Sequence, residues 1–202
     1  MNSRPATADD FEAILEVLKT DEETLFGRPS QIGIADLREW LSRTKLAEDS
    51  WLYEEDGELC AVGWFDQLPG DEVSFAAGIV HPAWKGRGLG AELVERSESR
   101  ARDYGCRRLH QFAVGPDAAA ARLFLARGYH EVRRFYQMAI ELEDAPVALD
   151  LGIETLDPGD VEEFHAALDD AFRDHWEHHG SPFEEWWERH RRNPNLDLSL
   201  WF

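Results

Sequence analysis

The feature of this chain that most constrains its fold is a basic, glycine-rich segment between an apolar run and a helical pattern. The apolar run covers 73–80, Pro82 follows, and the loop reads Lys85-Gly-Arg-Gly-Leu-Gly-Ala91. Apolar residues at helical spacing then continue to Tyr104. Glycine lets a backbone bend tightly and approach a ligand, and the first amides of a helix attract anions. A strand, a glycine loop and a helix in this order predict a site for a diphosphate.

The spacing of the glycines separates several known phosphate loops. Gly-x-x-x-x-Gly-Lys-Ser/Thr is absent, and glycines at 86, 88 and 90 do not fit the dinucleotide pattern Gly-x-Gly-x-x-Gly. A glycine-rich turn without a ligand stays open as an alternative. The segment resembles the acetyl-CoA loop of the GNAT superfamily of N-acetyltransferases, Gln/Arg-x-x-Gly-x-Gly/Ala. Lys85 takes the Gln/Arg place, and Gly88 and Gly90 are the two glycines.

A second motif lies further along the chain. GNAT proteins commonly carry Asn-x-x-Ala-x-x-Leu-Tyr-x-x-x-Gly-Phe on a short helix, and the register is kept here by Asp117, Ala120, Leu123, Phe124, Gly128 and Tyr129. Three members differ from the family pattern. Asp117 replaces the asparagine, Phe124 the tyrosine, and Tyr129 the phenylalanine.

The order of predicted elements also resembles the GNAT order, β-α-α-β-β-β-α-β-α-β-β. We expect strands at 1–4, 51–55, 59–66, 73–80, 109–114, 129–133 and 136–142, and helices at 7–18, 34–43, 89–104 and 117–127. Residues 21–33 are expected to form a loop. The resemblance implies an α/β (α+β) fold, with a mixed, mostly antiparallel sheet flanked by helices, over a domain at 1–143.

The remainder of the chain is expected to be a linker at 144–152 and a further segment at 153–202. Strand-like residues at its two ends enclose helical patterns at 161–176 and 181–191, a partial β-α-α-β unit. This order resembles the start of a second GNAT domain, as in tandem-GNAT proteins of the mycothiol-synthase type. The sequence would then be a fragment of a longer protein, or the half-domain an appendage. A helical arm that packs through its tryptophans on the first domain or on a partner subunit is the alternative.

The resemblance implies a set of cofactor-binding residues. The strands at 73–80 and 109–114 would splay apart, and backbone groups near Ile79, Val80 and His81 would hold pantetheine and polarise the thioester carbonyl. The diphosphate would lie on Lys85, Gly86, Arg87, Gly88, Leu89, Gly90 and Ala91. Asp117, Ala120 and Phe124 would complete the pocket. Acetyl-CoA is therefore the expected cosubstrate.

Transfer of an acetyl group to an amine also requires groups that accept and return protons. Phe124 stands where the family usually has its tyrosine acid, and a phenyl ring cannot donate a proton. Either water or another group protonates the thiolate, or the domain binds acyl-CoA without turning it over. Glu72 and Tyr136 are the candidate bases. His110 and Asp117 are further candidates, although Asp117 also suits a plain helix cap.

The expected acceptor is a primary amine of a small molecule or peptide. It would enter beside the loop at 21–33 and the turn at 133–136, whose arginines suit an acceptor that also bears a carboxylate or phosphate. The chain has 41 acidic and 21 basic residues and a formal charge of −20. Such a charge indicates either a generally acidic surface or a groove that attracts cationic amines, and it argues against nucleic acid as a partner.

The remaining patterns bear on location and metals. Cys60 and Cys106 lie in apolar surroundings without metal-ligand spacing, which predicts free thiols in a reducing, cytoplasmic compartment. No apolar run reaches the length of a membrane span. Four histidines, His175, His178, His179 and His190, lack a convincing third ligand, so we expect no metal. A homodimer or a second GNAT domain is the expected protein partner.

Overall fold

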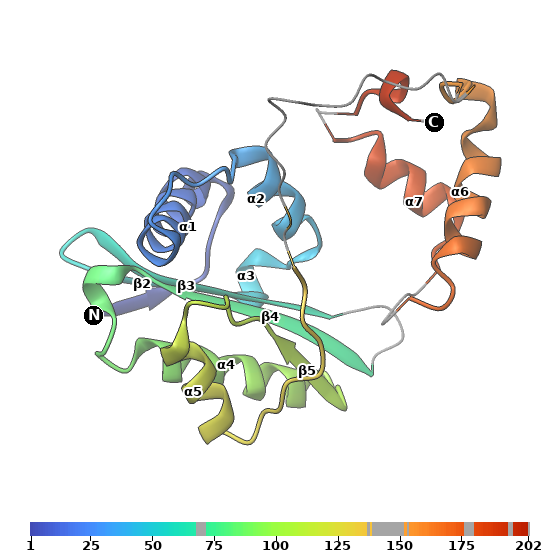
Figure 1. Cartoon of the computed structure of the whole chain (residues 1–202). Coiled ribbons are helices and arrows are strands. Elements are labelled where there is room, and N and C mark those ends of the chain that lie inside the picture. Colours follow the sequence, from blue (N-terminus) through green and yellow to red (C-terminus); the bar gives the residue numbers. More distant parts are fainter. Residues whose placement is uncertain are drawn as a thin grey trace. The chain divides into compact units, whose positions relative to one another are not determined.

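The computed structural model describes residues 1–67, 72–136, 138, 152, 154–175, 180–193 and 196–201. The chain divides into two compact units, Met1–Glu131 and Val132–Phe202, drawn in Figure 1. No helix in the described part of the chain is both long and apolar enough to cross a membrane.

The first unit is built on a five-stranded sheet with the order β1-β2-β3-β4-β5. The strands are β1 (Asn2–Arg4), β2 (Ser50–Glu55), β3 (Glu58–Gln67), β4 (Val73–Val80) and β5 (Arg108–Gln111). The first three pairings are antiparallel, and β4 pairs with β5 in parallel. The predicted mixed, mostly antiparallel sheet is confirmed.

Helices cover both faces of this sheet (Figure 1). One face carries α1 (Phe11–Phe26), α2 (Ile34–Trp40) and the short α3 (Leu46–Asp49), and the other carries α4 (Leu89–Asp103) and α5 (Ala118–Ala126). Turns of 3-10 helix lie at Ala8–Asp10, Leu41–Arg43 and Pro82–Trp84. Apolar side chains of α1, α2 and α4 are buried in the core, and its larger cluster includes Ile14, Leu15, Leu18, Leu37, Leu52, Val62 and Trp64.

Two glycines bring α4 close to the sheet. Gly63 of β3 pairs with Gly78 of β4, and Leu93 of α4 packs over both. A Cβ added at Gly63 would lie 2.7 Å from Leu93 Cδ2, and one at Gly78 would lie 3.3 Å from Leu93 Cβ. Because no side chain separates them, the start of α4 is held beside the end of β4.

Two predicted boundaries in the first unit are wrong. α1 extends to Phe26, so the loop expected at 21–33 begins only at Gly27. No helix breaker precedes Gly27, which adopts a left-handed conformation (φ 65°) and donates its N–H to the Glu23 carbonyl at 2.8 Å. The strand expected at 109–114 ends at Gln111.

The predicted closing hairpin is not seen as such in the described residues. Residues 129–136 carry no strand, and the second predicted strand, at 136–142, lies almost entirely outside the described residues. The predicted domain and linker limits at 143 and 144–152 fall there as well, and they stay predictions.

The described part of the second unit contains α6 (Val161–Ala171), α7 (Phe183–His190) and 3-10 turns at Pro158–Asp160 and Leu198–Leu200. α6 ends earlier than the predicted 161–176. Leu198–Leu200 replace the strand expected at 196–202, because the Asp197 carboxylate accepts the Ser199 N–H at 2.9 Å and starts a turn. No strand is assigned over 154–156, although Leu156 N–H donates to the Trp201 carbonyl at 2.8 Å.

An aromatic group holds the second unit together. Trp186 is buried, and its ring lies 4.7 Å from the ring of His165, 4.2 Å from His190 and 5.9 Å from Trp201. These rings join α6, α7 and the segment that ends at Trp201. Trp186, one of the tryptophans that were expected to pack on another surface, is therefore a core residue of the second unit.

Candidate functional site

The parallel strands β4 and β5 diverge partway along β4. Their pairing runs from Val73 with Arg108 to Ala76 with Gln111, where β5 ends. β4 continues to Val80 and stays paired with β3 on its other side. Within the described residues no other strand pairs with this part of β4. The predicted splay is confirmed, and we call the point of divergence at Ala76 and Gln111 the fork.

The glycine-rich loop follows β4 and turns directly into α4. Gly86 and Gly88 have positive φ angles of 79° and 91°, and a Cβ added at either would meet nothing within 4 Å. The first helical hydrogen bond runs from Glu92 N–H to the Gly88 carbonyl at 3.1 Å. By helix geometry, the amides of Leu89, Gly90 and Ala91 have no carbonyl one turn earlier to bind. Open space and outward amides fit a diphosphate.

Lys85 bridges three elements around this loop. Its Nζ lies 2.6 Å from Asp21 Oδ1 of α1 and 3.4 Å from Asp117 Oδ2, the residue before α5. Burial disfavours the charge of the lysine, but the two carboxylates raise the pKa of Lys85 above its ordinary value. Two internal carboxylates thus already neutralise Lys85, which ties α1 and α5 to the loop.

Arg87 remains as the second cation of the loop. Its guanidinium lies 4.3 Å from the centre of the Trp84 ring. Stacking of this kind orients an arginine without neutralising its charge. Arg87 is therefore better suited than Lys85 to meet a phosphate.

Asp117 and α5 lie against one side of the loop. Asp117 Oδ1 accepts the N–H groups of Ala119 and Ala120 at 3.1 and 2.9 Å. Burial acts to raise the pKa of Asp117, but the Ala120 amide and the Lys85 ammonium hold it below its usual range. The predicted helix cap is confirmed, and this carboxylate stays ionised.

α5 also packs directly on the loop. A Cβ at Gly90 would lie 3.5 Å from Leu123 Cδ2 and 4.0 Å from Val80 Cγ2, so a small residue is favoured there. The ring of Phe124 lies beside that of Tyr129, with 5.4 Å between centroids. Ile79, Val80 and Phe124 thus lie on elements that meet around the loop. His81 differs, because its N–H donates to the Cys60 carbonyl at 2.9 Å and is already in use.

The structure places one of the two candidate bases, Glu72, away from the loop. Glu72 precedes β4, and its carbonyl accepts the N–H groups of Arg107 and Arg108 at 3.0 and 2.9 Å. Its carboxylate pairs with Arg107 at 3.4 Å, and both side chains are mostly exposed. Glu72 lies at the paired end of β4, whereas the loop follows the other end. Tyr136 is exposed and belongs to the second unit.

Two polar side chains beside the fork were not among the sequence candidates for chemistry. Asp66 at the end of β3 is paired across the sheet with Phe75, and its Oδ1 accepts the Thr44 hydroxyl at 2.5 Å. Burial raises its pKa above the usual range. Tyr129 accepts a hydrogen bond from Gln111 Nε2 at 2.9 Å. The sequence alone could not have identified Asp66, because an isolated aspartate at a strand end belongs to no motif. Tyr129 could have been identified, because it replaces the phenylalanine of the family's Gly-Phe pair.

His110 lies on β5 next to the fork residue Gln111. Its ring stacks on Phe75 with 5.2 Å between centroids, and Phe75 stacks in turn on the exposed Phe112 at 5.6 Å. His110 and Asp66 are both cross-strand neighbours of Phe75. A carboxylate, an aromatic ring and an imidazole thus form a row across three strands.

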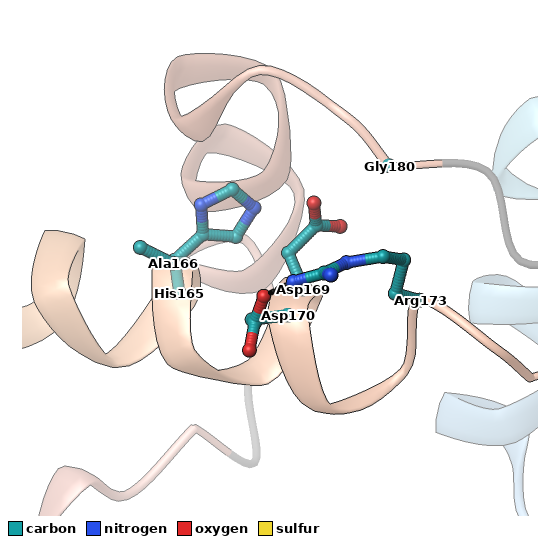
Figure 2. Close-up of a pocket in the computed structure, with 6 residues that line it drawn as sticks. All are labelled: His165, Ala166, Asp169, Asp170, Arg173 and Gly180. Carbon is teal, nitrogen blue, oxygen red and sulfur yellow. Dashed lines mark ion pairs between the residues drawn. The ribbon is translucent and has the colours of Figure 1, made fainter.

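Each unit carries a surface depression. One follows the exposed face of α4 from Gly88 to Ser99. The other, in the second unit, has a volume of about 570 Å³ and is lined by His165, Ala166, Asp169, Asp170, Arg173 and Gly180. Figure 2 shows Arg173 folded back to an ion pair with Asp170, and both side chains are largely exposed. The second depression brings no set of donors around one point, so we assign it no chemistry.

No group of three metal-ligating side chains occurs among the described residues, and His178 and His179 lie outside them. Cys60 and Cys106 are free thiols, as expected.

Comparison with known proteins agrees with this geometry. The family described as Acetyltransferase (GNAT) matches residues 11–129, more than half of the chain. A mycothiol acetyltransferase from Thermomonospora curvata is 32% identical over 151 residues, which cover 71% of this chain and 50% of that protein. This chain therefore spans about half the length of that relative.

Solved structures extend the likeness. The GCN5-related N-acetyltransferase from Sphaerobacter thermophilus has a TM-score of 0.77 and 25% identity, over 96% of this chain and 64% of that one. The structure of yncA from Salmonella typhimurium with its cofactor acetyl-CoA shares the fold, with a TM-score of 0.54 and 22% identity over 69% and 85% of the two chains. With the glycine loop, the fork and the family match in agreement, the chain belongs to the GNAT family of acetyltransferases, whose acyl donor is acetyl-CoA.

Proposed function

We propose that the first unit transfers the acetyl group of acetyl-CoA to the primary amine of a small molecule or peptide. The observation that carries this proposal is the glycine loop, with its open left-handed turns, placed where β4 and β5 diverge. The relative named mycothiol acetyltransferase favours a small molecule over a peptide.

The diphosphate is proposed to lie on the amides from Arg87 to Ala91, with the guanidinium of Arg87 beside it. Pantetheine then follows the edge of β4 that β5 leaves, near Ile79 and Val80. A thioester held there has its carbonyl next to backbone donors, which favours the tetrahedral intermediate as negative charge develops on oxygen.

The amine attacks this carbonyl after losing a proton, and the thiolate of coenzyme A then leaves. Glu72 is four residues before Ala76, about 13 Å along an extended strand, so a proton would reach it only through water. His110 lies at the fork itself and is the closer base among the candidates in the first unit. Tyr136 lies outside the first unit and stays a prediction from the sequence.

We further propose that the acceptor enters on the side of α1, beside the shortened loop at 27–33. The excess of acidic residues would attract a cationic amine. Free thiols at Cys60 and Cys106 support a cytoplasmic location, and a second GNAT domain or a homodimer is the proposed partner.

Thiol release measured with acetyl-CoA and a panel of amines tests this function, with calorimetry of acetyl-CoA alone beside it. Binding with amine-dependent release of thiol supports an acetyltransferase. Binding without release from any amine would identify a catalytically degenerate acyl-CoA-binding module. If acetyl-CoA does not bind, the result favours a protein that interacts with partners through its second unit.

A further inference from the structure

A pair of aromatic rings lies beside the fork. Phe124, on α5, and Tyr129 have ring centroids 5.4 Å apart. The chain turns between them at Gly128, whose φ is 88°, and Tyr129 N–H donates to the Phe124 carbonyl at 3.0 Å. The backbone thus fixes the two rings as neighbours.

The hydroxyl of Tyr129 is directed to the fork. Gln111, whose side-chain Nε2 donates to this hydroxyl at 2.9 Å, is the last residue of β5 that pairs with β4. The phenol oxygen therefore lies within one hydrogen bond of the side chain of a fork residue. Tyr129 is half-buried there. Its partner Gln111 lies on the face of the sheet that α4 covers, because Gln111 pairs with Ala76 and Leu93 of α4 packs on Gly78, two residues along β4.

We propose that Tyr129 donates the proton that the thiolate of coenzyme A takes up as it leaves. This inference rests on the proposed acetyl transfer. The nitrogen of the amine forms a bond to the carbonyl carbon, and the carbon–sulfur bond breaks with its electron pair on sulfur. The phenol proton passes to that sulfur, and the proton lost by the amine nitrogen returns to the phenolate through water. Atoms and charge balance without an oxidant or reductant.

The surroundings of the hydroxyl suit this role. Because Gln111 donates to the oxygen, the hydrogen of the phenol is left for a different acceptor. Burial raises the pKa of Tyr129, which keeps the phenol protonated at neutral pH, while the Gln111 amide acts in the opposite direction by stabilising the phenolate.

The charged groups facing the hydroxyl come from α4 and the end of α5. Glu98 acts to raise the pKa of Tyr129, and Arg127 and Arg102 act to lower it. Arg127 binds Glu98 at 3.0 and 2.8 Å, and Arg102 lies 3.4 Å from the same carboxylate. The two arginines thus act against the effect of Glu98 on the phenolate.

Tyr129→Phe tests the proposal, because it keeps the ring and removes only the hydroxyl. We expect kcat to fall about 100-fold, the usual scale for loss of a general acid, and KM for acetyl-CoA to change less than about threefold. Tyr104→Phe is the matched control. It removes another partly buried hydroxyl, bonded to Asp49 at 3.0 Å at the far end of α4, and should leave kcat unchanged.

A double variant separates chemistry from packing. Phe124→Tyr added to Tyr129→Phe moves the hydroxyl to the neighbouring ring and should recover at least tenfold of the lost kcat, since the rings are adjacent. Phe124→Tyr alone is the control, because it places a tyrosine at the family's usual acid position while the Tyr129 hydroxyl is kept. An equal gain in kcat with and without the Tyr129 hydroxyl would indicate a structural role for Tyr129. If Tyr129→Phe keeps the wild-type kcat and the wild-type pH profile, the proposal is wrong.

A binding measurement decides the question without turnover. Calorimetry should show that Tyr129→Phe weakens the binding of coenzyme A several-fold and leaves that of desulfo-coenzyme A, which lacks the sulfur, unchanged. Equal losses for both ligands, or none, would overturn the sulfur contact. If the wild-type protein binds coenzyme A but releases no thiol with any amine, the proposed function is wrong. The comparison of coenzyme A with desulfo-coenzyme A still tests the contact between Tyr129 and the sulfur.

Discussion

Gly88→Ala separates the backbone strain of the glycine loop from its contact with a ligand. Gly88 has a φ of 91° and open space around its Cβ position, so alanine adds strain and no clash in the free protein. That strain is about 1–2 kcal/mol for an L-residue, equivalent to about 2–8 °C in Tm for a chain of this size. With acyl-CoA present, the methyl group also displaces a phosphate from an amide. Loss of one charged hydrogen bond, about 1.5–3 kcal/mol, weakens binding roughly 10- to 100-fold.

Gly105→Ala is the matched control for this measurement. Gly105 has a φ of 73° and equally open surroundings, but it follows the opposite end of the 15-residue helix α4, about 22 Å from the loop. Thermal melts should show similar destabilisation of both variants, and calorimetry with acetyl-CoA should show weakened binding for Gly88→Ala only. Equal affinities of Gly88→Ala, Gly105→Ala and the wild-type protein would refute the placement of the diphosphate.

Three further predictions concern the scaffold around the site. Asp117→Ala should lower the free energy of unfolding, measured in urea, by about 0.5–2 kcal/mol through loss of the α5 cap. Asp117→Asn should lower it less, because its side-chain oxygen can still accept the Ala120 N–H. Equal losses for the two variants would contradict the cap. Gly63→Ala should lower the free energy of unfolding by about 1–3 kcal/mol, because its Cβ would lie 2.7 Å from Leu93. Gly78→Ala should lower it less, because its Cβ would lie 3.3 Å from Leu93. The reverse order in urea unfolding would contradict the close approach of α4. The hydrogen bonds of Arg4 hold the pKa of Asp10 well below its usual range, so this pair contributes stability above about pH 4 that is lost as the pH falls through the lower, folded-state pKa. Arg4→Gln should therefore flatten the loss of stability between pH 5 and 2 by up to about 1 kcal/mol, and an unchanged pH dependence would contradict the pair.

The sequence predicted the elements around the loop because local chemistry determines them. Gly86 and Gly88 occupy the left-handed conformations that other residues avoid, and Asp117 caps the helix that it precedes. β4 and α4 have uninterrupted apolar patterns, and their observed limits lie within one residue of the predicted ones.

Features that depend on contacts distant in sequence could not be predicted. The pairing of Lys85 with Asp21 needs both the full length of α1 and its placement beside the loop. β5 ends at Gln111, where its pairing with β4 stops, although apolar residues follow. The bond between Gln111 and Tyr129 likewise appears only once α5 is folded against α4 and β5.

The most direct test of the account is the response of the backbone amides of Arg87 to Ala91 in an amide-resolved NMR titration. We predict that coenzyme A shifts these resonances strongly and that pantetheine, which lacks the diphosphate, leaves them nearly unchanged while it shifts residues of β4 beyond Ala76. If coenzyme A binds and the amides of this segment do not respond, the diphosphate lies elsewhere and the central claim is wrong.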